Sequence, residues 1–223
     1  MSAKVVELVN PEVHIKAPPI DEASSERITE LRSLLVDEPL YQEYSVWCSD
    51  EQLQRFLTAR QNRIPQAKDL TLAALKWRKT RIPPEGITAL PHWQVTMKRQ
   101  SETGKIFISG VDQYNRPVIV MDNSVQNSTD YEEIQTFVAF SLDQAVDIMS
   151  PTVDKYLVFF NLKNFSLFNC PPVKSCSETV FMLSNGYPER LGHLIVYKPP
   201  FVLWSVYNAF KVRVCVYADV VYV

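Results

Sequence analysis

The spacing of the apolar residues changes near Gly104, and this change constrains the fold more than any other feature of the chain. Before Gly104, apolar side chains recur every three or four positions, which is the period of a helix face. After it, short apolar runs alternate with longer helical stretches. Helices followed by alternating strands and helices are typical of an α/β layer. We therefore expect an α/β protein in which a small N-terminal helical module precedes a mixed β-sheet with packed helices.

Three helices are predicted in the first part of the chain. The first follows Ser24, the second is capped by Ser49, and the third begins near Pro65 and ends at a Pro-Pro pair. Residues 1–20 contain three prolines and show no period, so we expect a disordered or extended arm there. The helical module is then expected over residues 21–82.

The second part of the chain is predicted to alternate between strands and helices. The apolar run over 156–162 is typical of a central strand that is buried on both faces. The predicted elements, in order, are strands over 105–109 and 117–121, a helix from Asp130, the strand over 156–162, a helix over 172–187, a strand over 194–197 and a helix over 201–210.

Motifs of common enzymes and metal sites are missing from the sequence. The 5 glycines fit neither a dinucleotide fingerprint nor a P-loop, and no G-x-S-x-G segment occurs. The 3 histidines form no H-E-x-x-H pair, and the 4 cysteines form no C-x-x-C pair. We therefore expect no cofactor, no metal and no enzymatic activity.

Charge and hydropathy restrict the partners and the compartment. The net charge of −2 argues against general nucleic-acid binding, and no apolar run approaches the length of a membrane span. Few cysteines favour a reducing environment, so we expect a cytoplasmic protein. Residues 50–105 carry 11 basic and 5 acidic side chains. This block is either a solvated helical surface or a face that meets anionic lipid.

Three segments in register resemble the CRAL-TRIO lipid-binding family. Asn115 stands where the family has a glycine, and Lys198 stands where it has an asparagine. The segments that carry the resemblance are LQRFLTAR at 53–60 with ALKWR at 74–78, GVDQYNRPV at 110–118, and YPERL at 187–191 followed by LIVYKPP at 194–200.

The resemblance implies a lipid carrier rather than an enzyme. Such a protein holds one hydrophobic ligand in a pocket floored by the sheet, closes it with a mobile gate helix, and exchanges it at membranes. We expect phosphatidylinositol as the ligand, a monomer, and a transient, peripheral association with a membrane surface. Two alternatives remain: a docking or regulatory module without transfer activity, and an α/β enzyme, which the missing motifs disfavour.

The resemblance also suggests headgroup residues. Arg60 matches an arginine near the inositol phosphate, Glu189 matches a glutamate that hydrogen-bonds inositol hydroxyls, and Arg190 lies beside it. Each of them has a plainer alternative, which is a surface pair or a structural salt bridge. Two hydroxyl positions used for choline lipids fall on Tyr156 and Val158, so phosphatidylcholine is not expected.

The last expectations concern the gate helix and the C-terminal segment of the chain. Residues 201–210 contain no charged side chain, so this helix is either buried or set against lipid. We expect the lipid-binding domain over residues 83–211 to be incomplete, or truncated, and residues 212–223 to form a divergent, strand-like tail. The expected gate residues are Phe201, Leu203, Trp204, Tyr207 and Phe210.

Overall fold

The computed structural model describes residues 19–163, 173–198 and 219–222. The chain divides into two compact units. The helical unit comprises Ala17–Trp93 and Thr179–Glu189, and the sheet unit comprises the remainder. The expected N-terminal arm, apart from its last two residues, and the expected gate helix lie outside the described residues.

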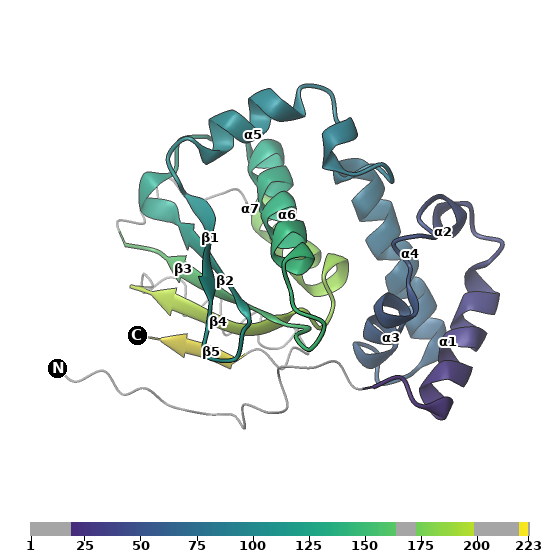
Figure 1. Cartoon of the computed structure of the whole chain (residues 1–223). Coiled ribbons are helices and arrows are strands. Elements are labelled where there is room, and N and C mark those ends of the chain that lie inside the picture. Colours follow the sequence, from purple (N-terminus) through teal and green to yellow (C-terminus); the bar gives the residue numbers. More distant parts are fainter. Residues whose placement is uncertain (1–18, 164–172, 199–218, 223) are drawn as a thin grey trace. The chain divides into compact units, whose positions relative to one another are not determined.

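The helical unit contains the three expected helices and one that the sequence did not indicate. Its helices are α1 (Glu22–Leu35), α2 (Pro39–Glu43), α3 (Asp50–Thr58) and α4 (Ile64–Arg81), followed by the 3-10 turn η2 (Ile87–Ala89) (Figure 1). The side chain of Ser49 caps α3 by accepting a hydrogen bond from the Gln52 amide, as predicted. The five-residue helix α2 is too short to show a helical period.

Leucine and phenylalanine side chains from α1, α3 and α4 form the core of the helical unit. The fully buried members of this core include Leu31, Leu35, Leu53, Phe56, Leu57 and Leu75. At the edge of the core, the Arg78 guanidinium stacks 4.6 Å above the Trp47 ring. The Tyr44 hydroxyl donates a hydrogen bond to the Ile82 carbonyl at 3.0 Å, which fixes the end of α4. The helical module therefore has its own hydrophobic core.

A segment from the second half of the sequence packs on α4. Helix α7 (Val173–Phe181) leads into the single π-helical turn η5 (Met182–Gly186), instead of continuing as one regular helix over 172–187. A Cβ atom on Gly186 would lie 3.0 Å from the Trp77 ring, so glycine permits this close approach. The Trp77 and Tyr187 rings meet edge to face at 6.2 Å. The helical unit thus contains residues beyond the boundary expected at position 82.

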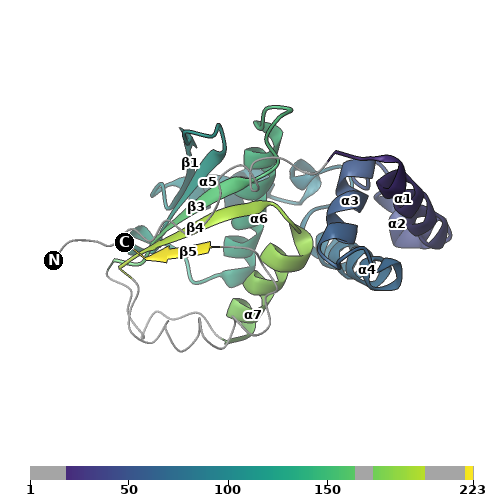
Figure 2. The same ribbon diagram turned by 90° about the horizontal axis from the view of Figure 1, so that it is seen from below.

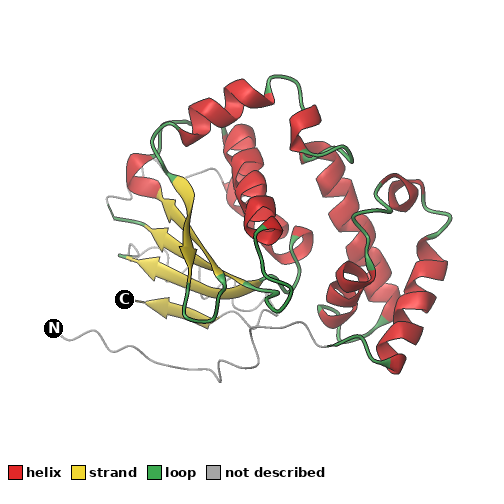
Figure 3. Cartoon of the chain, viewed as in Figure 1, coloured by secondary structure: helices red, strands yellow, loops and turns green. Residues whose placement is uncertain are grey.

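The sheet unit contains a five-stranded mixed sheet, which confirms the expected α/β class. Its strands are β1 (Ile106–Val111), β2 (Pro117–Asp122), β3 (Tyr156–Asn161), β4 (Leu191–Tyr197) and β5 (Asp219–Tyr222). They are arranged in chain order; among these described strands the β1–β2 pair is antiparallel and the other three pairs are parallel (Figure 3). Strand β5, within the expected tail, pairs in parallel with β4.

The turn between β1 and β2 explains a departure from the family motif. Asn115 has a φ of 61°, in the left-handed region where the family has glycine and where asparagine is tolerated. The Asp112 carboxylate accepts hydrogen bonds from the amides of Tyr114 and Arg116, both at 2.9 Å. The substitution therefore preserves the turn.

Helices pack against one face of the sheet. The helices of the sheet unit are α5 (Trp93–Ser101), the 3-10 turn η3 (Asn123–Val125) and α6 (Tyr131–Asp147), and α7 begins in it. Asp130 caps α6, as predicted. Figure 2 shows α6 and α7 on the same side of the sheet, and the side chain of Gln135 on α6 donates a hydrogen bond to the Ser175 carbonyl on α7.

The two faces of the sheet differ in burial. Ile119 and Val158, adjacent in the register, are buried. Their neighbours Val120 and Phe159, which point to the opposite face, are only half-buried, and Phe107 in the same row is 47% exposed. The expectation that the central strand is buried on both faces is therefore wrong.

Candidate functional site

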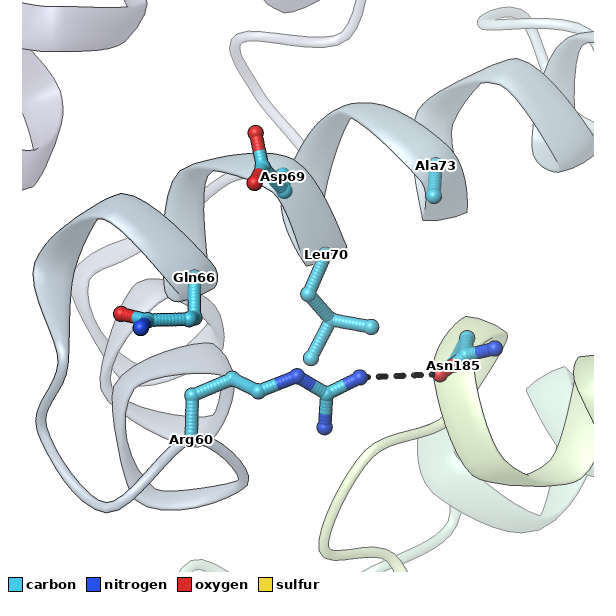
Figure 4. A pocket seen from close by; sticks show the side chains of 6 residues that line it. All are labelled: Arg60, Gln66, Asp69, Leu70, Ala73 and Asn185. Carbon is cyan, nitrogen blue, oxygen red and sulfur yellow. Dashed lines mark hydrogen bonds between the residues drawn. The ribbon is translucent and has the colours of Figure 1, made fainter. Parts of the chain in front are cut away.

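A hollow of about 300 Å³ opens on the helical unit, between α4 and η5 (Figure 4). It combines polar and apolar side chains from three parts of the sequence. The lining residues are Arg60, Gln66, Asp69, Leu70, Ala73 and Asn185.

A tight turn after α3 brings Arg60 to the hollow. Gln61 and Asn62 have φ values of 54° and 60°, so two consecutive left-handed residues reverse the chain before α4 begins. Because residues three, four and seven positions apart share one helix face, α4 presents its four lining residues on the same side. The hollow therefore depends on local helix and turn geometry.

Arg60 carries a charge that no nearby carboxylate neutralises in the described part of the chain. Its guanidinium donates a hydrogen bond to the Ala59 carbonyl at 3.0 Å and another to the Asn185 side-chain oxygen at 3.3 Å. Figure 4 shows its side chain extending past Leu70 toward Asn185. A half-buried guanidinium that is held only by neutral acceptors retains donors for an anionic ligand.

The other polar lining residues are also open to a ligand. Gln66 and Asp69 are exposed on α4, and neither side chain makes a hydrogen bond or ion pair with another described residue. Leu70 is buried and Ala73 half-buried, so they supply an apolar wall. The hollow therefore combines one cation, one anion and two amides beside a small apolar surface.

Glu189 does not line this hollow, although it belongs to the helical unit. It is half-buried and has a φ of 60°, a left-handed conformation that is uncommon for glutamate. The structure thus brings Arg60 together with Asn185, which the sequence did not indicate, and not with Glu189. The headgroup role expected of Glu189 stays a prediction.

Arg190 belongs to the sheet unit and is held in a buried ion pair. Its guanidinium donates hydrogen bonds to the Asp154 carboxylate at 2.6 Å and to the Asp154 carbonyl at 3.1 Å. Asp154 is only 6% exposed. This arrangement is the structural salt bridge considered above, and a headgroup role for Arg190 stays a prediction.

Tyr156 and Val158, at the family's hydroxyl positions, are both buried in the sheet. The Tyr156 hydroxyl has no hydrogen-bond partner among the described residues, and its burial raises the pKa of the phenol above its usual value.

The basic block over residues 50–105 forms several surface ion pairs. Lys68 pairs with Glu38 at 2.8 Å and Lys79 pairs with Glu43 at 2.6 Å, so part of the positive charge on α4 is neutralised by α2 and its cap. These pairs favour the interpretation of this part of the block as a solvated surface.

Neither a metal site nor a membrane span is found in the part of the chain that the structure describes. No three histidine, cysteine, aspartate or glutamate side chains are grouped closely enough there to hold a metal ion. Within the same ranges, no helix is both long and apolar enough to cross a membrane.

Comparison with known proteins identifies relatives over most of the chain. A CRAL-TRIO domain-containing protein of Schizosaccharomyces pombe is 26% identical over 73% of this chain. The phosphatidylinositol transfer protein CSR1 of Eremothecium gossypii is 27% identical over 73% of it. The phosphatidylinositol transfer protein PDR17 of Saccharomyces cerevisiae is 27% identical over 76% of it. The matches cover 16%, 39% and 50% of these relatives' own lengths.

The fold and the family agree with these relatives. The crystal structure of Sfh5 superposes with a TM-score of 0.62 at 12% identity, covering 92% of this chain and 82% of that one, which shows a shared fold. The family described as CRAL/TRIO domain matches residues 101–213, about half of the chain. This chain therefore belongs to the CRAL/TRIO domain family.

Proposed function

We propose that this protein binds phosphatidylinositol in an internal pocket and exchanges it between membranes. The observation that carries the proposal is that two relatives named as phosphatidylinositol transfer proteins match about three quarters of the chain. Membership of the CRAL/TRIO domain family supports it. The proposal involves binding and exchange and includes no chemical step.

Exchange makes the headgroup decisive for selectivity. Burying an acyl chain of about 16 carbons away from water is worth about 0.8 kcal/mol per methylene group, but a bilayer supplies the same energy. A carrier must therefore match the apolar environment of the bilayer and distinguish lipids by a few polar contacts. These contacts should come from side chains that the fold itself does not use.

Arg60 is the residue that best meets this requirement. A guanidinium suits phosphate because its N–H donors lie in one plane and match two phosphate oxygens. The hollow of about 300 Å³ is at the lower limit for small-molecule sites, so it suits a headgroup rather than a whole lipid. We assign the phosphate to Arg60, and we propose that Glu189, which does not line the hollow, binds inositol hydroxyls outside it.

The acyl chains require separate apolar room. We propose that the uncharged segment 201–210 closes over them and opens at a membrane. The side chains assigned to this gate are Phe201, Leu203, Trp204, Tyr207 and Phe210.

Lipid identification and vesicle transfer test the proposal. The full chain should be purified and its bound lipid identified by native mass spectrometry. Transfer of labelled phosphatidylinositol between vesicles should then be compared with transfer of labelled phosphatidylcholine. We expect bound inositol lipid and faster transfer of phosphatidylinositol. If no lipid is bound and no transfer occurs, the proposal is wrong.

Matched arginine variants test the headgroup site. Arg60→Gln should reduce phosphatidylinositol transfer about 10-fold or more, since a hydrogen bond to a charged group contributes about 1.5–3 kcal/mol. Arg63→Gln is the control because Arg63 is exposed, lies three residues away and does not line the hollow. Equal effects of the two variants would show that Arg60 contributes only general positive charge.

Glu189→Gln separates a carrier from a docking module. The variant keeps the size of the side chain and removes its charge, so inositol-lipid transfer should fall in a carrier. A docking module would keep its membrane binding and show no inositol-dependent change.

A further inference from the structure

The hollow is lined by one charge of each sign, and no ion pair joins the two charged side chains. Arg60 supplies one positive charge and Asp69 one negative charge, while Gln66 and Asn185 are neutral. The Asp69 carboxylate forms no ion pair with any described residue, so its charge is not neutralised by a neighbouring side chain in that part of the chain. A ligand in the hollow therefore meets one attractive and one repulsive site for phosphate.

Asn185 presents a further donor beside Arg60. Its side-chain oxygen accepts a hydrogen bond from the Arg60 guanidinium, which assigns the oxygen to that side of the amide. The amide nitrogen makes no hydrogen bond with another described residue. It is therefore available to a hydroxyl or a phosphate oxygen of the ligand. Asn185 can position Arg60 and contact the ligand at once.

We propose that Asp69 makes this hollow selective for a polyol that carries one phosphate and excludes polyols with additional phosphates. The inference rests on the proposed function, because it assumes that an inositol phosphate enters the hollow. Arg60 neutralises a single phosphodiester. A second phosphate, as a monoester, adds between about one and a half and two negative charges, for which the described lining residues offer no second cation.

The size of the hollow makes the repulsion effective. A sphere of about 300 Å³ is about 8 Å across, which is comparable to the Debye length of about 8 Å at physiological ionic strength. Salt therefore screens the Asp69 carboxylate from a bound phosphate only in part. At about 1 M salt the Debye length falls to about 3 Å, and the discrimination should weaken.

The phosphorylated polyol has two possible sources, a membrane lipid or a soluble molecule. Binding should be measured between the full chain and vesicles made of a neutral lipid with a small fraction of either phosphatidylinositol or phosphatidylinositol 4-phosphate. The soluble arm uses glycerophosphoinositol and glycerophosphoinositol 4-phosphate, which keep the phosphodiester of the lipid headgroup. Binding to vesicles alone would assign a lipid headgroup, and binding of the singly phosphorylated soluble compound as tightly as the matching vesicles would assign a soluble phosphate.

Two charge-matched variants test the role of Asp69. The wild-type chain should bind the singly phosphorylated probe at least fivefold more tightly than the doubly phosphorylated one. Asp69→Asn should reduce this preference below twofold by strengthening binding of the second probe. Asp37→Asn changes the net charge equally, but Asp37 is exposed between α1 and α2 and does not line the hollow, so the preference should persist.

The outcomes separate the inference from the proposed function. If the wild type binds phosphatidylinositol but the two variants shift the preference equally, Asp69 has no special role and the inference is wrong. If the wild type ignores both lipids yet distinguishes the soluble phosphates through Asp69, the proposed function fails and the selectivity stands. If no probe binds, both are overturned. Circular dichroism of each variant confirms that the fold is intact.

Discussion

The hollow of the helical unit and the polar clusters of the sheet unit use charged side chains in opposite ways. In the sheet unit, Arg116 is only 4% exposed and pairs with Asp112 at 2.6 Å. Arg190 is likewise paired with Asp154. In the hollow, Arg60 forms no ion pair with a described residue. The difference separates arginines that hold the fold together from one that is available to a ligand.

The cluster around Arg116 shows how completely the sheet unit uses such a group. The guanidinium contacts His193 Nδ1 at 2.6 Å, and since arginine only donates, this nitrogen accepts the hydrogen bond. A Cβ atom on Gly192 would lie 3.0 Å from the same guanidinium nitrogen, so glycine leaves room for it. This arginine therefore anchors the β1–β2 turn to β4.

The largest effect is expected from Arg190→Met. The variant breaks the buried ion pair between Arg190 and the Asp154 carboxylate by removing one partner, which typically costs about 3–5 kcal/mol of unfolding free energy. Urea denaturation followed by circular dichroism measures the loss. The control is Lys79→Met, because the Lys79 side chain is 55% exposed and its pair with Glu43 should contribute less than about 1 kcal/mol. Equal losses for both variants would show that the buried ion pair stabilises the fold no more than the exposed one does.

A smaller, pH-dependent effect is expected at Lys105. This lysine is 2% exposed, and its ammonium group donates hydrogen bonds to the side-chain oxygens of Gln100, Gln126 and Asn127 at 2.5–2.8 Å. Burial lowers the pKa of Lys105 to about 8 from an ordinary value of 10.5. The folded state therefore releases this proton at a lower pH than the unfolded state does.

The sign of the pH dependence follows from proton binding. Between about pH 8 and 10.5 the unfolded chain binds more protons at Lys105, so the unfolding free energy should rise with pH in this window. After allowance for solvent screening, the gain should be about 1–2 kcal/mol. Lys105→Met should lack this contribution, and the difference between the two pH profiles isolates it. If the unfolding free energies of the wild type and of Lys105→Met changed with pH in parallel, the pKa of Lys105 would be the same in the folded and unfolded states.

Local signals in the sequence were sufficient to predict most of the described elements and their order, but not the helices α2 and α5. Ser49 and Asp130 act as the expected helix caps, and the spacing change near Gly104 correctly marked the mixed sheet. The missed π turn at Met182–Gly186 has no comparable pattern, because its position depends on packing between Gly186 and Trp77.

The hollow was only partly predictable for the same reason. Arg60 was indicated by the family resemblance, but its partner Asn185 is 125 positions away. Asp69 looks in sequence like any exposed helix charge, and the left-handed turn at Gln61 and Asn62 brings it into a common lining with Arg60, to which η5 adds Asn185 by packing on α4. Similarly, nothing local to Arg190 indicates that Asp154 holds it.

The smallest effect on stability, and the sharpest test of the comparison, is expected at Asn185. Asn185→Ala removes a long 3.3 Å hydrogen bond at a half-buried position, so the unfolding free energy should change by less than about 1 kcal/mol. Lipid binding should nevertheless weaken about three- to tenfold, because the Arg60 guanidinium loses its hydrogen-bond acceptor and the ligand loses an amide donor.

The variant Asn185→Asp separates these two effects. It keeps the acceptor for Arg60 and should stabilise the fold by only about 0–1 kcal/mol. It also places a carboxylate against the Arg60 guanidinium and should weaken phosphate binding more than alanine does. A loss of binding that ran parallel to a loss of stability would place this residue with Arg190 among the side chains that serve the fold.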